Sequence, residues 1–265
     1  MVLETTKPAE SLQPFLKEYY FIHLQAKQDV KHIPLIDDGC YDFVFFKEAK
    51  ANFFHGEKST MIPIQYKVFT IHDLKPPFKM TFSDMITFFT IKVQPWTNAY
   101  FFSYLPTKGI LDVSIKNTEL SQLHNQLFTK VTIAERIELA NSFMHSKNLK
   151  LSANMEFVKR LCEHIYTERG VISVNDLAIT FGKSRQYLNK IFKKEVLYSL
   201  KKFIITVRIL DLVKYKVKHP EISLTKLSYD YGYFDQSHFI RDFKNIAGAT
   251  PRYYFNNLPE FLLRH

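Results

Sequence analysis

The segment GYFDQSHFIRDFKNIAGATP, residues 232–251, decides how the rest of the chain is interpreted. Gly232 suits a turn that needs a positive φ. Asp235 or Ser237 can cap a helix that begins just after the turn. The closing GATP, with its glycine and proline, ends that helix. The segment therefore predicts a turn followed by a short, sharply bounded helix.

The predicted helix has two faces of different chemistry. Phe239 and Phe243 are four residues apart and share an apolar face. The opposite face is polar and cationic, and it carries Gln236, His238, Arg241 and Lys244. A short helix with a buried aromatic stripe and such an outer face fits a DNA major groove.

The basic excess of the chain is concentrated in its C-terminal part. Residues 155–265 contain 19 Lys and Arg against 11 Asp and Glu, a net charge of +8. Residues 1–154 contain 17 against 15, a net charge of +2. This asymmetry favours an anionic partner for the C-terminal part, and a membrane surface or RNA satisfies it as well as DNA does.

Composition narrows the class of protein. Apolar residues make up 46% of the 265, enough for a core in one large domain or two ordinary ones. No apolar run approaches the ~18 residues of a membrane span, and the N-terminus shows no signal peptide, so we expect a cytoplasmic protein. Cys40 and Cys162 lie far apart without partners at metal-ligand spacing, which indicates reduced thiols.

Residues 15–96 show short strand-like runs without intervening helical periods. The runs are rich in aromatic and β-branched residues, and proline and glycine separate them. Several short strands at this spacing predict a small antiparallel barrel or sandwich, whereas residues 1–10 look like a loose entry. The runs are Tyr19–Leu24, Tyr41–Phe46, Ala51–His55, Gln65–Ile71, Lys79–Phe82 and Met85–Val93.

The pattern changes from strands to helices after Pro106. Apolar residues at helical spacing predict two helices, Glu119–Phe128 and Thr132–His145, which close the first domain. Residues 146–153 form a short polar linker. From Asn154 onward every run has helical spacing.

The helical part repeats itself. The pattern LA-x3-G at residues 177–182 matches LS-x3-G at residues 227–232, fifty residues later. The pattern L-x3-F at residues 188–192 matches F-x3-F at residues 239–243, fifty-one residues later, so the extra residue falls in the second turn. The repeat predicts two helix-turn-helix units, joined by a long helix at about residues 199–218.

Residues 155–258 resemble the DNA-binding domain of the AraC/XylS family of transcription regulators. The first unit departs from the family after its second helix. Leu197 and Leu200 stand there, where the family often has glycine and proline. That departure puts the shape of the turn in doubt. The family's C-terminal signature is matched in register by Gly232, Tyr233, Phe234, Ser237, Phe239, Arg241, Phe243, Lys244, Gly248, Thr250, Pro251 and Tyr254.

The first 150 residues are similar to the cupin-like sensing and dimerisation domain of many family members. The runs at residues 91–95 and 134–136 resemble an N-terminal domain of regulators from the Bacteroidetes group. The resemblance implies an α+β fold: a cupin-like antiparallel β-barrel with two following helices, then an all-α domain of two helix-turn-helix units. We place the sensing or dimerisation domain at residues 1–148 and the AraC-type DNA-binding domain at residues 154–258.

The resemblance places recognition helices at residues 184–195 and 235–244, in successive major grooves. Their early outward positions are expected to reach base edges, where Arg pairs with guanine and Gln or Asn with adenine. The predicted base readers are Arg185, Gln186, Asn189, Gln236, Ser237, His238 and Arg241. The predicted phosphate contacts are Lys183, Lys190, Lys193, Lys194, Lys244 and Arg252, with helix amides near Ser173 and Ser223.

Aromatic residues of the first domain form a candidate pocket for a small-molecule effector, although aromatic residues also simply fill small barrels. The candidates are Tyr20, Tyr41, Phe43, Phe45, Phe88 and Trp96. No His-x-His pair occurs among His23, His32, His55 and His72, so we expect no metal. No phosphate loop or nucleophile elbow occurs either, so we expect no cofactor and no enzyme, and Cys40 is interpreted as a small buried hydrophobe.

Together these features predict a sequence-specific DNA-binding regulator of transcription, with activation or repression left open. We expect a homodimer through the two helices that follow the strands, and RNA polymerase as a further partner. One alternative is a metabolite-binding cupin-like protein whose basic helical module binds DNA only non-specifically. The other is a DNA-repair or alkyl-transfer enzyme with the same module, which would need an activated cysteine.

Overall fold

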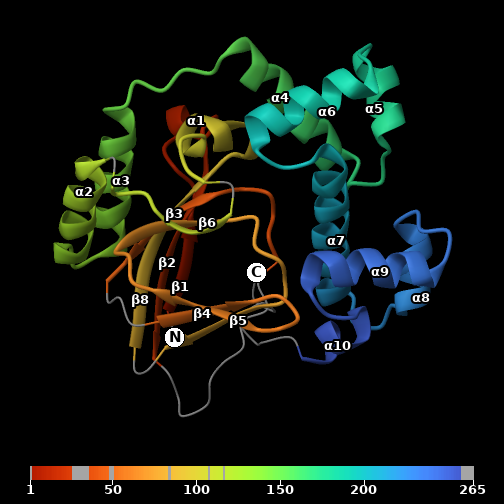
Figure 1. The fold of residues 1–265 in the computed structure, drawn as a ribbon, viewed down its shortest axis with the longest axis horizontal. Helices are drawn as coiled ribbons and strands as arrows, with labels where there is room; N and C mark the ends of the chain where they lie inside the picture. The colour runs from red at the N-terminus through yellow and green to blue at the C-terminus, as the bar shows by residue number, and fades with distance from the viewer. Residues whose placement is uncertain are drawn as a thin grey trace.

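A β-rich N-terminal part and an all-helical C-terminal part lie side by side (Figure 1). The computed structural model describes residues 2–25, 36–47, 51–82, 85–106, 108–115 and 117–257. The polar segment after residue 145 crosses from one part to the other, as the linker prediction requires (Figure 1).

Within these ranges, nine strands form two antiparallel sheets. The larger sheet has the order β1-β2-β8-β3-β6-β9, and the smaller has the order β5-β4-β7. β8 lies inside the larger sheet, between β2 and β3, and its Ile86, Phe89 and Ile91 are buried. The strands are β1 (Val2–Thr6), β2 (Leu16–Gln25), β3 (Asp42–Phe46), β4 (Ala51–His55), β5 (Thr60–Ile64), β6 (Val68–His72), β7 (Phe78–Phe82), β8 (Met85–Val93) and β9 (Gly109–Asp112).

All six predicted strands are present, and three further strands were missed. The expectation of a loose entry at residues 1–10 is wrong, because β1 pairs with β2 from Val2 to Thr6. β1 and β9 are edge strands, and β5 is an edge strand that contains Pro63. Edge strands are short and tolerate proline and polar residues, so they lack the alternation by which central strands are recognised.

The two helices α2 (Thr118–Thr129) and α3 (Ile133–His145) cover the side of the sheets remote from the C-terminal part (Figure 1). A capping box joins Thr132 and Glu135 at the start of α3. Leu120, Leu123 and Met144 are buried in the same core as the β2 and β8 side chains. The helical elements of this part are η2 (Pro95–Thr97), α1 (Asn98–Phe102), α2 (Thr118–Thr129) and α3 (Ile133–His145), after a short 3-10 turn η1 (Glu10–Leu12).

The C-terminal part consists of two helix-turn-helix units joined by a long helix, as the repeat predicts. α7 runs between the units, with α4, α5 and α6 at one end and α8, α9 and α10 at the other (Figure 1). Of the two predicted caps, Asp235 begins a helix; Ser173 and Ser184 begin two others, and Gly182 ends one in the left-handed region. The helices are α4 (Ala153–Thr167), α5 (Val174–Phe181), α6 (Arg185–Val196), α7 (Leu200–Lys218), α8 (Leu224–Asp230), α9 (Gln236–Ala247) and α10 (Pro251–Asn256).

The turn after the first recognition helix keeps the shape of its counterpart in the second unit. Leu197 ends α6 with φ 61°, and Gly248 ends α9 with φ 74°. Leu200 then begins α7 as Pro251 begins α10. The sequence difference therefore leaves the turn unchanged, at the cost of holding a leucine in the left-handed region.

Candidate nucleic-acid interface

Side-chain caps fix the first turns of α6 and α9, where the predicted readers lie. The Ser184 hydroxyl accepts a hydrogen bond from the Tyr187 amide at 3.2 Å. The Asp235 carboxylate accepts one from the His238 amide at 2.7 Å. Each cap satisfies an amide that would otherwise lack a partner at the helix start. Both helices therefore begin at defined points.

The apolar faces of α6 and α9 are buried in two separate cores. Phe192 lies 5.1 Å from Phe203 between ring centres, and Phe243 lies 5.4 Å from Tyr254. Both phenylalanines and Leu188 are completely buried. Because one face of each helix is fixed inward, its polar face is held outward as the sequence predicts.

Six of the seven predicted base readers are exposed, and His238 is half-buried. Asn189 donates to the Arg185 carbonyl at 2.8 Å, and Gln236 donates to the Thr225 hydroxyl at 2.6 Å. Each amide keeps its oxygen for another partner. Within the described part of the chain, the readers whose side chains have no internal hydrogen bond or ion pair are Arg185, Gln186, Ser237 and Arg241.

His238 is held against its own helix. Its Nε2 lies 3.3 Å from the Asp242 carboxylate, which is buried. Its ring meets that of Tyr233 edge to face at 5.2 Å. Of the predicted readers, His238 is therefore the one whose side chain is most restricted by contacts within the protein.

The six predicted phosphate contacts are all exposed, but their surroundings differ. Lys183 lies over the Tyr187 ring at 5.7 Å. Lys244 pairs at 3.0 Å with Glu57, in the turn between β4 and β5.

At the start of α5, Asp176 accepts bonds from the Ser173 amide and hydroxyl, which lower the pKa of its carboxyl. That end of α5 already carries a negative charge, which weakens the case for a phosphate there.

The N-terminal part reaches deep into the first unit. Trp96 is packed in the core of that unit, beside residues such as Val158 and Phe192. Asn98 is completely buried, and its amide donates to the Gly39 and Val196 carbonyls at 2.8 and 2.9 Å. Its oxygen accepts from the Tyr41 amide at 3.0 Å. Sequence reasoning missed Asn98, because no local pattern marks a side chain whose partners are 57 to 98 residues away.

The N-terminal part contacts the second unit at the end of α9 and through Ile36, which packs against the core of that unit. Gly248 approaches Pro77 so closely that a Cβ on the glycine would lie 2.4 Å from the Pro77 Cα. Val196 and Gly248 are at the C-terminal ends of α6 and α9. The N-terminal part therefore contacts the trailing ends of both recognition helices, and the reading residues lie toward the leading ends.

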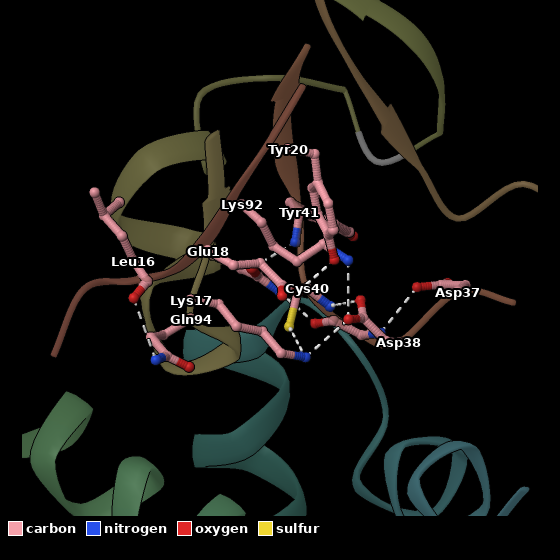
Figure 2. A network of polar contacts seen from close by, with 12 residues as sticks. Leu16, Lys17, Glu18, Tyr20, Asp37, Asp38, Cys40, Tyr41, Lys92 and Gln94 are labelled. Carbon is pink, nitrogen blue, oxygen red and sulfur yellow. Dashed lines mark hydrogen bonds and ion pairs between the residues drawn. The ribbon is translucent and has the colours of Figure 1, made fainter. Parts of the chain in front are cut away.

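A partly buried charge network lies next to Gly39, whose carbonyl Asn98 contacts, with helices of the C-terminal part just beneath it (Figure 2). Asp38 is shared by Lys17 at 2.8 Å and Lys92 at 3.0 Å. Burial acts to raise the pKa of Asp38, but the two lysines outweigh it and hold that pKa well below its usual range. Burial raises the pKa of Asp42 to about 7. Tyr20, a candidate pocket residue, donates to Glu18, and the face of its ring lies 5.2 Å from the Lys92 ammonium (Figure 2).

The six candidate pocket residues are distributed over several environments. Tyr41, Phe43 and Phe45 belong to one core, and Phe88 packs against another. Trp96 lies in the core of the first helix-turn-helix unit. The structure thus brings three of the six together, and the pocket stays a prediction.

The burial of Cys40 agrees with its interpretation as a small buried hydrophobe. Cys40 and Cys162 are free and buried. His72 bonds the Pro106 carbonyl at 3.2 Å, and burial lowers the pKa of its ring to about 4. Among the described residues there is no cluster of three His, Cys, Asp or Glu able to hold a metal, and His32 lies outside them.

The comparison with protein families matches the helical region. The family model described as a helix-turn-helix domain matches residues 177–257. The Msm operon regulatory protein of Streptococcus mutans is 29% identical over 143 residues, which are 52% of this chain and 50% of that protein. An uncharacterized HTH-type transcriptional regulator of Staphylococcus aureus is 24% identical over 57% of this chain and 20% of its own length. The matches thus span at most half of these relatives.

A solved structure of ToxT from Vibrio cholerae is similar with a TM-score of 0.47 at 13% identity, over 90% of this chain and 98% of that one. No helix in the described ranges combines the length and the apolar character that crossing a membrane requires.

Proposed function

We propose that this chain is an AraC-type regulator that binds duplex DNA sequence-specifically and regulates transcription, and the helix-turn-helix family match at residues 177–257 supports this proposal. The observation that carries the proposal is the matched pair of leading helix ends. Arg185 and Gln186 on α6, and Ser237 and Arg241 on α9, are exposed on helices whose other faces are buried. Such ends reach base edges when helices of this kind enter successive major grooves.

The test is binding of the full chain to duplexes selected from a random library, measured across salt concentrations. A regulator should lose affinity steeply as salt rises, because lysine and arginine displace counterions from phosphate. It should also keep a preference for its selected duplex over scrambled DNA. Steep salt dependence without preference would instead support the metabolite-binding alternative with non-specific DNA binding.

We also propose that the N-terminal part, residues 1–148, is the regulatory part. It contacts the trailing ends of both recognition helices, so a change in its shape reaches both. A small molecule bound there shifts DNA binding only if its affinity differs between two arrangements of the chain. The assay is DNA affinity with and without small molecules that bind the N-terminal part. A ligand that binds without changing DNA affinity would count against this role.

We further propose that the chain forms a homodimer through α2 and α3. We place it in a bacterial cytoplasm, with RNA polymerase as a further partner. Sedimentation of the full chain at micromolar concentration tests the dimer directly. A monomer there would remove dimerisation while leaving DNA reading intact.

A further inference from the structure

Phe234 is the most exposed large apolar side chain that the structure describes. Its exposed fraction is 91%, compared with 2% for its neighbour Tyr233 and 2% for Phe239. It lies immediately before Asp235, the residue that caps α9. An isolated exposed apolar side chain is common on protein surfaces, so the exposure of Phe234 does not by itself indicate a role. Its position before α9 is the more informative feature.

The fold does not use Phe234 in the way residues at this position are often used. A hydrophobic residue before a helix cap commonly packs on the fourth residue of the helix, which here is Phe239. Tyr233 occupies that place instead, with its ring centre 5.4 Å from that of Phe239. The second turn is one residue longer than the first, so Tyr233 enters the core and Phe234 is left outside.

Phe234 precedes the leading end of α9, where the readers Gln236, Ser237 and Arg241 are also exposed. In helices of this class, the leading end is the part that meets base edges. A phenyl ring cannot pair with a base edge by hydrogen bonds, but it contacts the methyl group of thymine favourably. Thymine is the one base that presents such a methyl in the major groove.

The first unit carries a different residue at the matched place. Lys183 precedes the cap Ser184 as Phe234 precedes the cap Asp235. A lysine there suits phosphate, and phosphate contacts position a protein without reading sequence. The two units therefore present different chemistry at equivalent points.

We propose that Phe234 is a specificity-determining residue that reads the methyl group of a thymine in the half-site bound by the second unit. The inference rests on the proposed function and adds a base that the polar readers do not account for. It makes the two half-sites unequal, since Lys183 supplies no such preference to the first.

The experiment uses the full chain and the duplex that it selects from a random library. Each thymine of that duplex is replaced in turn by deoxyuridine, which removes only the methyl group. One replacement in the second half-site should weaken wild-type binding about fourfold, the effect of burying one methyl. The variant Phe234→Ala should bind that deoxyuridine duplex and the original thymine duplex equally. Its melting temperature should match that of the wild type, because the side chain is exposed.

The variant Phe234→Lys gives the matched control, since it copies Lys183. It should bind all duplexes more tightly at low salt, with a salt dependence steeper by about one ion, and lose the thymine preference. Equal responses of wild type and Phe234→Ala to every deoxyuridine would overturn the thymine contact while leaving the proposed function intact. A wild-type chain without any sequence preference would overturn both.

Discussion

The N-terminal part places the buried side chains of Trp96 and Asn98 in the first helix-turn-helix unit. On the second unit it places Pro77 against Gly248 and Glu57 opposite Lys244, together with Ile36, which is only partly buried against the core. Trp96 and Asn98 are buried, and the Glu57 side chain is 77% exposed. An exposed ion pair contributes little, because water and salt screen it. Buried contacts are lost only at a substantial cost in free energy.

The difference indicates an asymmetric coupling between the two parts. A displacement of the N-terminal part carries the first unit with it through the buried contacts. The second unit follows through α7 and through its weaker surface contacts. The first unit is therefore the better anchored reader, and the second is the reader whose placement is easier to change.

The largest effect should come from emptying each core. Phe192→Ala and Phe243→Ala each remove a completely buried ring, which should cost about 3–5 kcal/mol of unfolding free energy. Trp96 is the only tryptophan of the chain and lies in the first core, so its fluorescence reports on that unit. In urea titrations, Phe192→Ala should shift the Trp96 transition, whereas Phe243→Ala should shift the helical signal of circular dichroism more than the Trp96 transition.

Identical shifts of both signals in both variants would contradict the asymmetry. They would show that the two units and the N-terminal part unfold as one cooperative unit.

Breaking the bridge made by Asn98 should have the next largest effect. Asn98→Ala leaves the Gly39 and Val196 carbonyls and the Tyr41 amide without their buried partner, which should cost about 1–3 kcal/mol or more. Asn98→Asp should be worse at neutral pH, because a carboxylate faces two carbonyl oxygens. Protease cleavage within residues 146–152 measures the loosening, and unchanged cleavage in both variants would argue against the bridge.

The readers Arg185 and Arg241, one from each unit, sharpen the comparison at the DNA. Each substitution by Ala should weaken binding to the selected duplex by about 1–3 kcal/mol and leave the melting temperature unchanged. Repeating the library selection should show that each variant loses preference in one half-site only. Loss of preference across the whole site in either variant would mean that the two helices do not read separate grooves.

Local signals in the sequence predicted most of the helical part, because caps and apolar spacing act over a few residues. The cap residues Ser173, Ser184 and Asp235 all begin helices where the pattern places them. Partners distant in sequence could not be read in the same way. Trp96 was expected to line a pocket of the sheet domain, and it lies in a helical core instead.

Leu197 shows a different limit of sequence reasoning. The rule that glycine ends a helix is a statement about strain, and a leucine can occupy the left-handed region when tertiary contacts offset that strain. Leu197 does so while packed against the core of the N-terminal part. The sequence shows that Leu197 departs from the family pattern. It does not show the tertiary contact that allows the turn to keep its shape.

The smallest effect should come from Leu197→Gly, at the residue that ends the first recognition helix. Leu197→Gly relieves about 1 kcal/mol of backbone strain but removes a half-buried side chain from the N-terminal core, so the net change should stay within about 1 kcal/mol. Gly248→Ala has no such compensation, because its Cβ at positive φ would meet Pro77. It should destabilise the chain by more than Leu197→Gly changes it, in urea titrations run side by side. A stabilisation well above 1 kcal/mol in Leu197→Gly would mean that the leucine contributes nothing to joining the first unit to the N-terminal part.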